Sequence, residues 1–353
     1  MIRLYYMNDT IKTSYLALFS KGQTLGSSAI YNLTDKSMSL VTIKRHLSVL
    51  KNQGYLASVG GGRSLKYKLT EKGLLLRPLD TAKYLAKDPD DRTVASKYNF
   101  DIFSEPKVKI FSKEELNNLS AATNNFHKLA KKSTEQEKNK ELLRFIVEFS
   151  WKTSKIEGNT YDLLSTEKLL LYGEKSPIHS TQEAQMIVNQ KKALEYALNH
   201  LDYFKNPNIA LLEKIHSIII GDLGIGSGLR QSLVGITGTN YLPLENVFQI
   251  KEALRDLFMY IERTENIYEK ALLTILGISY IQPFSDGNKR TSRLIANAIL
   301  LAHNYAPISY RSVNEQKYKE ACLVFYEQNS VVDFKKLFIE QYVFAANNYN
   351  VAQ

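Results

Sequence analysis

A short stretch between two apolar segments carries residue types that bind phosphate and metal ions. It reads Ile281-Gln-Pro-Phe-Ser-Asp-Gly-Asn-Lys-Arg-Thr-Ser-Arg293 and lies between the apolar runs 271–280 and 294–301. Each run is long enough for a buried helix, so the stretch is expected to form a turn between two helices. Gly287 permits a tight turn, and the helix that follows would direct its free N–H groups into that turn. Such a helix start attracts anions, and phosphate is the usual one.

Two arginines and an aspartate make this chemistry more specific. Arg290 and Arg293 share one face of a helix, where each guanidinium can hold two phosphate oxygens. Asp286 can hold the Mg²⁺ ion that accompanies nucleotide phosphates. The stretch therefore predicts a magnesium–polyphosphate site. The alternative is a polar turn between helices whose arginines lie on the surface.

The same stretch resembles the signature of the Fic (Fic/Doc) family. The family signature is His-Pro-Phe-x-(Asp/Glu)-Gly-Asn-(Gly/Lys)-Arg-x-x-Arg, and the chain has Gln282-Pro-Phe-Ser-Asp-Gly-Asn-Lys-Arg-Thr-Ser-Arg293. The resemblance implies ATP and Mg²⁺ as cofactors, and transfer of AMP to a Ser, Thr or Tyr hydroxyl of a protein target or of the chain itself. It also implies that Asp286 binds the metal. The nucleotide phosphates would be bound by Gly287, Asn288, Lys289, Arg290 and Arg293.

One position departs from the signature. Gln282 stands where the family has the catalytic histidine that takes the proton from the attacking hydroxyl. An amide cannot take up a proton near neutral pH, and general-base catalysis is worth roughly a hundred- to ten-thousand-fold in rate. Two functions therefore stay open. One is an adenylyltransferase relative whose transfer step is slowed or lost, and the other is a non-catalytic, nucleotide-responsive DNA-binding transcriptional regulator.

A second resemblance to the family lies upstream, in residues 145–158, which have helical periodicity and end at a glycine. Within them, Thr153 to Gly158 resembles the inhibitory motif (Ser/Thr)-x-x-x-Glu-(Gly/Asn). The resemblance implies that Glu157 pairs with Arg293 and blocks the place of the γ-phosphate. One guanidinium cannot hold the carboxylate and the triphosphate together, so the pair would lower ATP affinity or misplace the phosphates. The alternative is a surface glutamate at the end of a helix.

Most of the positive charge lies in residues 1–80. The chain has a net charge of +10, and this segment holds twelve Lys and Arg against four Asp and Glu. Such a concentration favours a nucleic-acid-binding module. Helical spacing at 14–20, 26–33 and 40–52, followed by a hairpin pattern from 55 to 69, predicts a winged helix.

The winged-helix pattern resembles bacterial regulators that bind double-stranded DNA with the third helix and the wing. The candidate DNA contacts are Thr42, Lys44, Arg45, Lys51, Arg63 and Lys66. His46 is interpreted as a solvated helix residue. The alternative is a winged helix used for protein contact or dimerisation.

Residues 228–243 break the helical rhythm with glycine, threonine and tyrosine, which predicts a short β-hairpin. The segment resembles the flap with which Fic proteins hold a target by strand addition. The residues implied in target docking are Thr237, Gly238, Thr239 and Tyr241. Tyr241 is also a candidate for self-modification, and the alternative is a plain surface hairpin.

The predicted fold is mainly α, with a winged-helix DNA-binding-like domain at 1–80, a linker at 81–108 and a Fic-like helical bundle at 109–350. No apolar run is long enough for a membrane span and no signal peptide is apparent, so we expect a cytoplasmic protein without a membrane partner. A homodimer is compatible with both modules. The single cysteine, Cys322, is expected in the core, and His216 is interpreted as a packed histidine.

Overall fold

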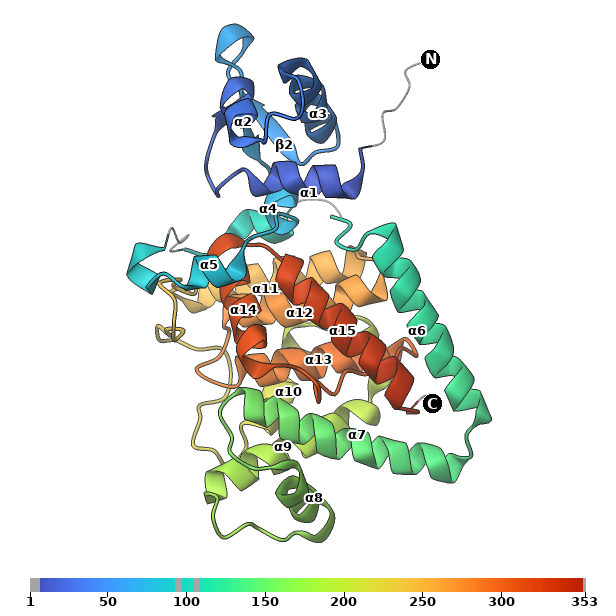
Figure 1. Ribbon diagram of the computed structural model, residues 1–353. Coiled ribbons are helices and arrows are strands. Elements are labelled where there is room, and N and C mark those ends of the chain that lie inside the picture. Colours follow the sequence, from blue (N-terminus) through green and yellow to red (C-terminus); the bar gives the residue numbers. More distant parts are fainter. Residues whose placement is uncertain (1–6, 93–96, 105–107, 352–353) are drawn as a thin grey trace.

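The computed structural model describes residues 7–92, 97–104 and 108–351 and is mainly helical (Figure 1). A small winged unit, residues 7–74, has a hydrophobic core of its own. It stands at one end of a larger helical body, residues 108–351, which has a separate and more extensive core. The expected mainly α fold with a small sheet is confirmed. None of the helices in the described residues has the length and apolar character to span a bilayer.

The winged unit contains three main helices and a three-stranded antiparallel sheet in the order β1-β3-β2. Its elements are α1 (Asp9–Ala17), β1 (Leu25–Gly26), α2 (Ser27–Leu33), α3 (Leu40–Asn52), β2 (Leu56–Val59), η1 (Gly62–Ser64), β3 (Lys66–Leu69) and α4 (Glu71–Leu75). Ser39 caps α3 by accepting a hydrogen bond from the Thr42 amide at 3.2 Å. The prediction of a first helix at 14–20 is wrong, because Asn8 caps the helix at an earlier position by accepting from the Thr10 amide.

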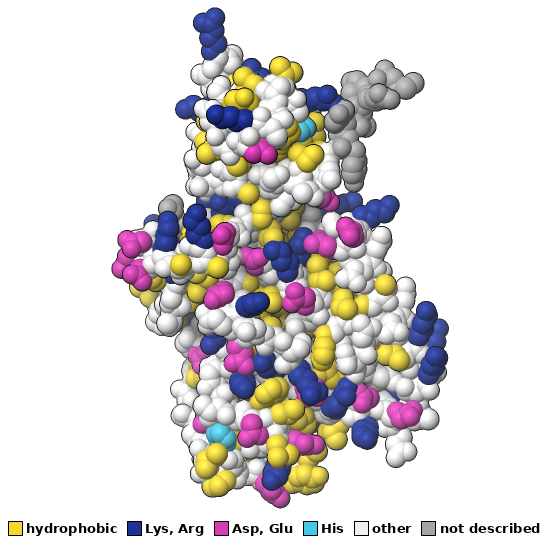
Figure 2. Space-filling model, in the orientation of Figure 1, with side chains coloured by type: hydrophobic (Ala, Val, Ile, Leu, Met, Phe, Trp, Pro, Cys, Tyr) yellow, Lys and Arg dark blue, Asp and Glu magenta, His cyan; other side chains and the backbone are white. Residues whose placement is uncertain are grey.

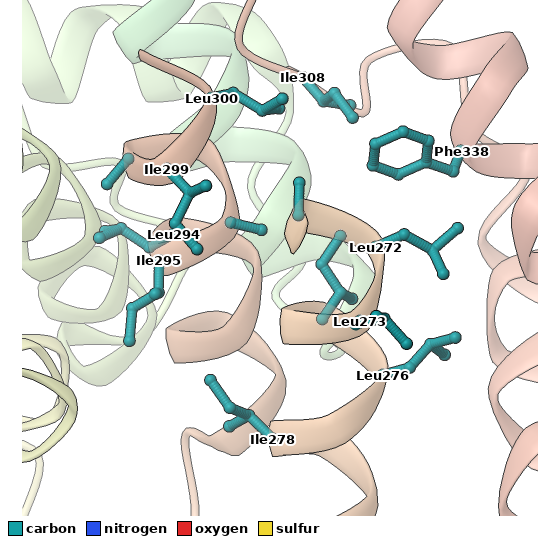
Figure 3. Close-up of a cluster of buried hydrophobic side chains, with 14 of the residues drawn as sticks. Leu272, Leu273, Leu276, Ile278, Leu294, Ile295, Ile299, Leu300, Ile308 and Phe338 are labelled. Atoms are coloured by element: carbon teal, nitrogen blue, oxygen red, sulfur yellow. The ribbon is translucent and has the colours of Figure 1, made fainter. Parts of the chain in front are cut away.

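The helical body is built around two consecutive helices, α12 (Ile267–Ile281) and α13 (Asn288–Ala302). Figure 3 shows their apolar side chains packed together with those of flanking segments. The surrounding helices are α6 (Lys113–Lys132), α7 (Glu135–Ile156), α8 (Leu163–Tyr172), α9 (Thr181–Leu198), η4 (Leu201–Lys205), α10 (Ile209–Ile219), α11 (Val247–Arg263), α14 (Glu315–Gln328) and α15 (Val332–Asn348). Because α12 and α13 are buried along nearly their whole length, the loop between them has rigid ends.

Parts of the predicted linker are packed onto the body. It forms α5 (Thr81–Leu85) and the short helices η2 (Pro89–Asp91) and η3 (Phe100–Phe103). Ile102 and Phe103 are buried in the core of the body. The segment lacks helical periodicity in its sequence, but its apolar side chains bury surface that a free connector would expose.

Gly277 allows α12 and α11 to approach closely. A Cβ atom built on Gly277 would lie 2.4 Å from Cδ1 of Leu257, which is itself fully buried on α11. A side chain here would force Leu257 out of its rotamer or push the two helices apart. The glycine therefore fixes the position of the helix that leads into the loop at 282–287.

We predict that Gly277→Ala lowers the free energy of unfolding. Overpacking costs about 1–3 kcal/mol, which exceeds the gain of about 1 kcal/mol that alanine gives over glycine inside a helix. Urea denaturation measures the difference. The control is Gly226→Ala, where a Cβ atom meets nothing within 4 Å. A Gly277→Ala protein as stable as this control would contradict the prediction.

Candidate functional site

The loop between α12 and α13 is closed by one asparagine side chain. Asn288 accepts a hydrogen bond from the Phe284 amide at 2.8 Å and donates one to the Phe284 carbonyl at 2.8 Å. The turn needs left-handed backbone at both ends, with φ +51° at Gln282 and φ +82° at Gly287. The loop is thus a fixed structure that presents the start of α13 to a neighbouring cavity.

Gln282 uses its side-chain amide to hold the loop together. Its Nε2 donates to the Ser279 carbonyl at 2.6 Å, and its Oε1 accepts from Asn288 Nδ2 at 2.9 Å. The side chain is almost buried, although it lines the cavity. Among the described residues that line this cavity there is no histidine. The arrangement therefore gives the amide a structural role at the edge of the cavity.

His216, on α10, supports the loop from behind. Its ring stacks on Phe284 with centroids 3.5 Å apart, and its Nε2 lies 2.9 Å from the Asp286 carbonyl. A carbonyl only accepts, so Nε2 carries the proton, and burial lowers the pKa of the imidazole to about 4. His216 is fully buried, which confirms that it is a packed histidine. Its contact with the loop was not predicted, because nothing in the sequence links α10 to residue 286.

Arg290 brings a buried positive charge to the start of α13, and one of its guanidinium nitrogens is unsatisfied within the described part of the chain. The residue is 2% exposed, and its NH2 lies 3.3 Å from Oδ2 of Asp286. Its NH1 has no hydrogen-bond partner among the described residues. The N-cap residue Gly287 supplies no side-chain cap either. Buried guanidinium nitrogens are normally satisfied, so this pair of features indicates a place for an anion.

Arg293 is completely buried and is paired with the end of α7. Its NH2 donates to Glu157 Oε1 at 2.8 Å, and its Nε donates to Thr153 Oγ1 at 2.6 Å. Burial alone would raise the pKa of Glu157, but the charges of Arg293 and Lys289 outweigh it and lower that pKa. The carboxylate is therefore ionised, and the structure contains the contact that the inhibitory motif implied. Gly158, at φ +99°, turns the chain away directly after it.

A cavity of about 460 Å³ joins the loop, Glu157 and α14. Arg293 itself is hidden from it, because Glu157 and Tyr318 cover the guanidinium; Tyr318 accepts from Arg293 NH1 at 3.3 Å. The α14 side chains that line the cavity are Gln316, Tyr318, Lys319, Cys322, Leu323 and Tyr326. The sequence gives no signal of this lining, since these residues form no recognisable motif.

The prediction of a β-hairpin flap at residues 228–243 is wrong. Residues 228–243 are described and contain no paired strands. Arg230 holds the segment instead, with its Nε donating to the Gln282 carbonyl at 2.7 Å and its NH2 to the Leu244 carbonyl at 2.5 Å. These bonds tie the segment to the loop, so a cross-strand ladder is not required to fix it.

Of the proposed docking residues, three remain near the surface and one does not. Thr237 and Gly238 are exposed, Thr237 lines the cavity, and Thr239 is half-buried. Tyr241 is 1% exposed and donates its hydroxyl to the Tyr280 carbonyl at 2.9 Å. The expectation that Tyr241 contacts a target or is modified is therefore wrong for this structure, because the ring packs in the core.

Basic side chains of the winged unit lie on its surface. On α3, Lys44, Arg45 and Lys51 are exposed, whereas Thr42 is half-buried. Arg63 and Lys66 are exposed on the wing. Figure 2 shows Lys and Arg side chains spread over the visible face of this unit, with few acidic ones. The interpretation of His46 as solvated is wrong, since it is buried with Nδ1 3.0 Å from the Tyr15 hydroxyl.

The cavity could hold a metal ion only together with a ligand. In the described part of the chain no three His, Cys, Asp or Glu side chains gather as a metal site. The Asp286 carboxylate lies at the rim, with a side chain 64% exposed. Mg²⁺ is commonly bound by one or two carboxylates plus phosphate oxygens and water, so this donor set fits a phosphate-bound Mg²⁺ and no dedicated cage.

Comparison with known proteins identifies relatives of part of the chain. Residues 206–300 match the model of the Fic/DOC family. The protein adenylyltransferase Fic of Aedes aegypti is 29% identical over 175 residues, which is 46% of this chain and 34% of the relative. The protein adenylyltransferase Fic of Nematostella vectensis is 28% identical over 171 residues, 47% of this chain and 40% of the relative. The chain thus spans less than half the length of these relatives.

Solved structures show a similar arrangement of helices. Fic-1 from C. elegans has a TM-score of 0.56 at 18% identity, covering 67% of this chain and 72% of that one. A Fic family protein from Desulfovibrio desulfuricans G20 has a TM-score of 0.54 at 21% identity, covering 67% of this chain and 74% of that one. At these identities the likeness shows the fold alone. The match of residues 206–300 to the Fic/DOC family model and the similarity in fold agree with each other.

Proposed function

We propose that the cavity binds ATP with Mg²⁺, and that the chain is a relative of the protein adenylyltransferases whose AMP-transfer step is slowed or lost with Gln282. The observation that carries the proposal is the buried, unpaired NH1 of Arg290 beside the uncapped start of α13, at the edge of a cavity of about 460 Å³. A charged donor left without a partner costs stability unless a ligand satisfies it.

Each part of a nucleotide's phosphate chain has a partner in this arrangement. The first N–H groups of α13 and Arg290 would bind phosphate oxygens, as helix starts and guanidinium groups commonly do. Asp286, at the rim, would hold Mg²⁺ jointly with those oxygens. Lys289, 3.7 Å from Glu157 Oε2, adds a further positive charge on the same side.

Glu157 is proposed to inhibit this site. Arg293 is fully buried and cannot stay unpaired, so a phosphate reaches it only where Glu157 leaves. A bound triphosphate must therefore replace the carboxylate or settle in a pose that Arg293 does not contact. Either outcome lowers affinity or misplaces the reacting phosphate.

Gln282 is proposed to separate nucleotide binding from chemistry. In AMP transfer the target's hydroxyl oxygen attacks the α-phosphorus, pyrophosphate leaves, and the hydroxyl proton must pass to an acceptor. The Gln282 amide cannot accept it and is already bonded to Ser279 and Asn288. Thr237, Gly238 and Thr239 remain the proposed place at which a protein target would rest beside the cavity.

A second proposed function is a nucleotide-responsive DNA-binding regulator. It is favoured by the exposed basic residues on α3 and the wing, which a purely enzymatic protein would not need. Double-stranded DNA would be the partner, with α3 in the major groove and the wing on the phosphate backbone. Loss of the transfer step would leave such a protein its nucleotide site as a sensor.

We predict that Glu157→Gly binds ATP–Mg²⁺ roughly ten- to a hundredfold more tightly than the unchanged chain in calorimetry. The change frees Arg293 for a charge-assisted contact worth about 1.5–3 kcal/mol. Adding Arg290→Met to this variant should lower affinity at least about tenfold. The control is Arg255→Met, an exposed arginine on α11. Absence of ATP binding by Glu157→Gly would exclude the proposed nucleotide site.

We predict that α-labelled ATP with Mg²⁺ labels no protein when the unchanged chain is the only enzyme. Gln282→His restores a proton acceptor beside the loop and should give labelling of the chain or of added protein. Combined with Glu157→Gly, labelling should be strongest, because inhibition and the missing base are both removed. Gln282→Asn, which restores no base, is the matched control. Labelling by the unchanged chain would show that the transfer step is intact.

We predict that the full chain binds double-stranded DNA with an affinity that falls as salt rises. Lys44→Gln and Lys66→Gln should each reduce the slope of log affinity against log salt by about 1, as expected for loss of one phosphate contact. Lys251→Gln, an exposed lysine on α11, should leave the slope unchanged. Fluorescence anisotropy with a labelled duplex measures this. Equal slopes in all variants would point to a protein-binding winged helix instead.

A further inference from the structure

Helix α14 contributes to two separate places in the molecule. Its residues Tyr318, Cys322 and Tyr326 line the cavity, and Tyr318 contacts the Arg293 guanidinium through both its hydroxyl and its ring, whose centroid lies 5.4 Å away. Its C-terminal end lies where the winged unit meets the body (Figure 1). One rigid helix therefore connects the candidate nucleotide site to the residues that hold the winged unit. These residues, 328–331, are called the seat below.

A buried arginine fastens the winged unit to this helix end. Arg77 is 4% exposed and donates from NH1 to the Phe19 carbonyl at 2.8 Å, inside the winged unit. From NH2 it donates to Gln328 Oε1 at 2.6 Å, and its carbonyl accepts from Ser330 Oγ at 2.5 Å. One side chain thus bonds to both parts of the molecule at once.

Further bonds surround this contact. Lys21 of the winged unit donates to Asn329 Oδ1 at 2.5 Å, and the Val331 amide donates to the Leu75 carbonyl at 2.9 Å. Asn329 ends α14 in the left-handed conformation, with φ +55°, and is fully buried. The bonds among these residues are directional and require the helix end in its present position.

A second buried arginine extends the connection to the flap segment. Arg92 NH1 pairs with Glu327 Oε1 at 3.2 Å, and both side chains are almost completely buried. Its NH2 donates to the Gly238 carbonyl at 2.5 Å. Asn240 in the same segment donates to Asp90 Oδ1 at 2.8 Å. The predicted linker is therefore fixed between the last turn of α14 and the proposed target-docking residues.

The start of the site loop is also in contact with this seat. Asn99 donates from Nδ2 to Glu71 Oε2 of α4 at 2.6 Å and to Asn329 Oδ1 at 3.2 Å. Its backbone amide donates to the Tyr280 hydroxyl at 2.9 Å. Tyr280 lies in the last turn of α12, two residues before Gln282. The seat and the site thus share contacts through two helices, α12 and α14.

We propose that the C-terminal end of α14 couples the nucleotide cavity to the winged unit, so that nucleotide binding weakens the docking of the winged unit and undocking strengthens nucleotide binding. The proposal rests on the nucleotide site proposed above and names its regulation. In the described conformation Arg293 is held by Glu157 and Tyr318 while Arg77 and Lys21 hold the winged unit. The docked state is thus the state in which Glu157 holds Arg293.

The direction of the proposed coupling follows from the Glu157–Arg293 pair. A triphosphate that takes Arg293 must displace Glu157 and change the contact with Tyr318 of α14. Under the proposal it therefore binds better when α14 has moved from its described position. A ligand shifts an equilibrium only by its difference in affinity for the two states. Coupling between two sites is reciprocal, so weakening the seat must raise nucleotide affinity by the same factor by which the nucleotide weakens the seat.

The test first measures ATP–Mg²⁺ binding by calorimetry in the full chain with Glu157→Gly, which shows whether the nucleotide site exists. Hydrogen–deuterium exchange is then followed in the full chain that keeps Glu157, with and without saturating ATP–Mg²⁺, because the proposed coupling acts through the Glu157–Arg293 pair. The Val331 amide, which donates to the Leu75 carbonyl, should exchange at least about fivefold faster when ATP is bound. In the same background, Arg77→Met and Lys21→Met should each lower the ATP dissociation constant by at least about fivefold.

The control is Lys36→Met, an exposed lysine of the winged unit, which should leave ATP affinity unchanged. Lys21→Met provides the answer where Arg77→Met fails to fold. Absence of ATP binding in calorimetry overturns the nucleotide site and the coupling together. Binding with unchanged Val331 exchange and unchanged affinity in both seat variants overturns the coupling alone. Protection of Val331 by ATP, or weaker ATP binding in the seat variants, also overturns it.

Discussion

The buried guanidinium of Arg293 is the constraint on which the site depends. A charge with no exposed surface needs a partner, and here Thr153, Glu157 and Tyr318 supply it. Because the partner can be a carboxylate or a phosphate but not both, the proposed nucleotide site would have two states, one with Glu157 on Arg293 and one with phosphate there. Glu157 is the C-cap residue of α7 and Tyr318 lies on α14, so the choice of partner concerns two helices from different parts of the chain. Under the proposal, the Glu157–Arg293 ion pair would therefore determine which of the two states the site adopts.

Gln282 holds the loop in shape through both ends of its side-chain amide. The amide donates to one carbonyl and accepts from Asn288, which itself closes the turn. A residue without these bonds would leave buried polar groups unsatisfied at the end of α12, at a cost of about 1–3 kcal/mol each. The glutamine is therefore compatible with a preformed anion site. Binding depends on the backbone and arginines, whereas transfer depends on a proton acceptor, so one substitution can remove the second without the first.

The sequence was informative where function depends on residues close together in the chain. The turn between α12 and α13 follows from local spacing, and the contact between Glu157 and Arg293 was implied by family resemblance. Predictions from the sequence failed where contacts between distant segments determine whether a side chain is buried. Tyr241 and His46 have polar groups that suggest exposure, yet each finds a buried hydrogen-bond partner elsewhere in the chain. Three further contacts join segments that are far apart in sequence: His216 with the loop, Arg230 with the loop, and α14 with the cavity. Single residues without a motif give no signal of such contacts.

The kind of contact between the winged unit and the body determines whether the winged unit can undock. Leu76 packs against the cores of both units, but the remaining contacts described above are largely hydrogen bonds made by Arg77, Lys21 and Asn99. A broad apolar interface would hold the units together whatever the site contained. Hydrogen bonds contribute only about 0.5–1.5 kcal/mol each after exchange with water, yet they fix geometry closely. A seat of this type specifies one docked position, and a ligand that weakens one or two of its bonds changes the free energy of docking by about 0.5–3 kcal/mol, close to the range of typical coupling.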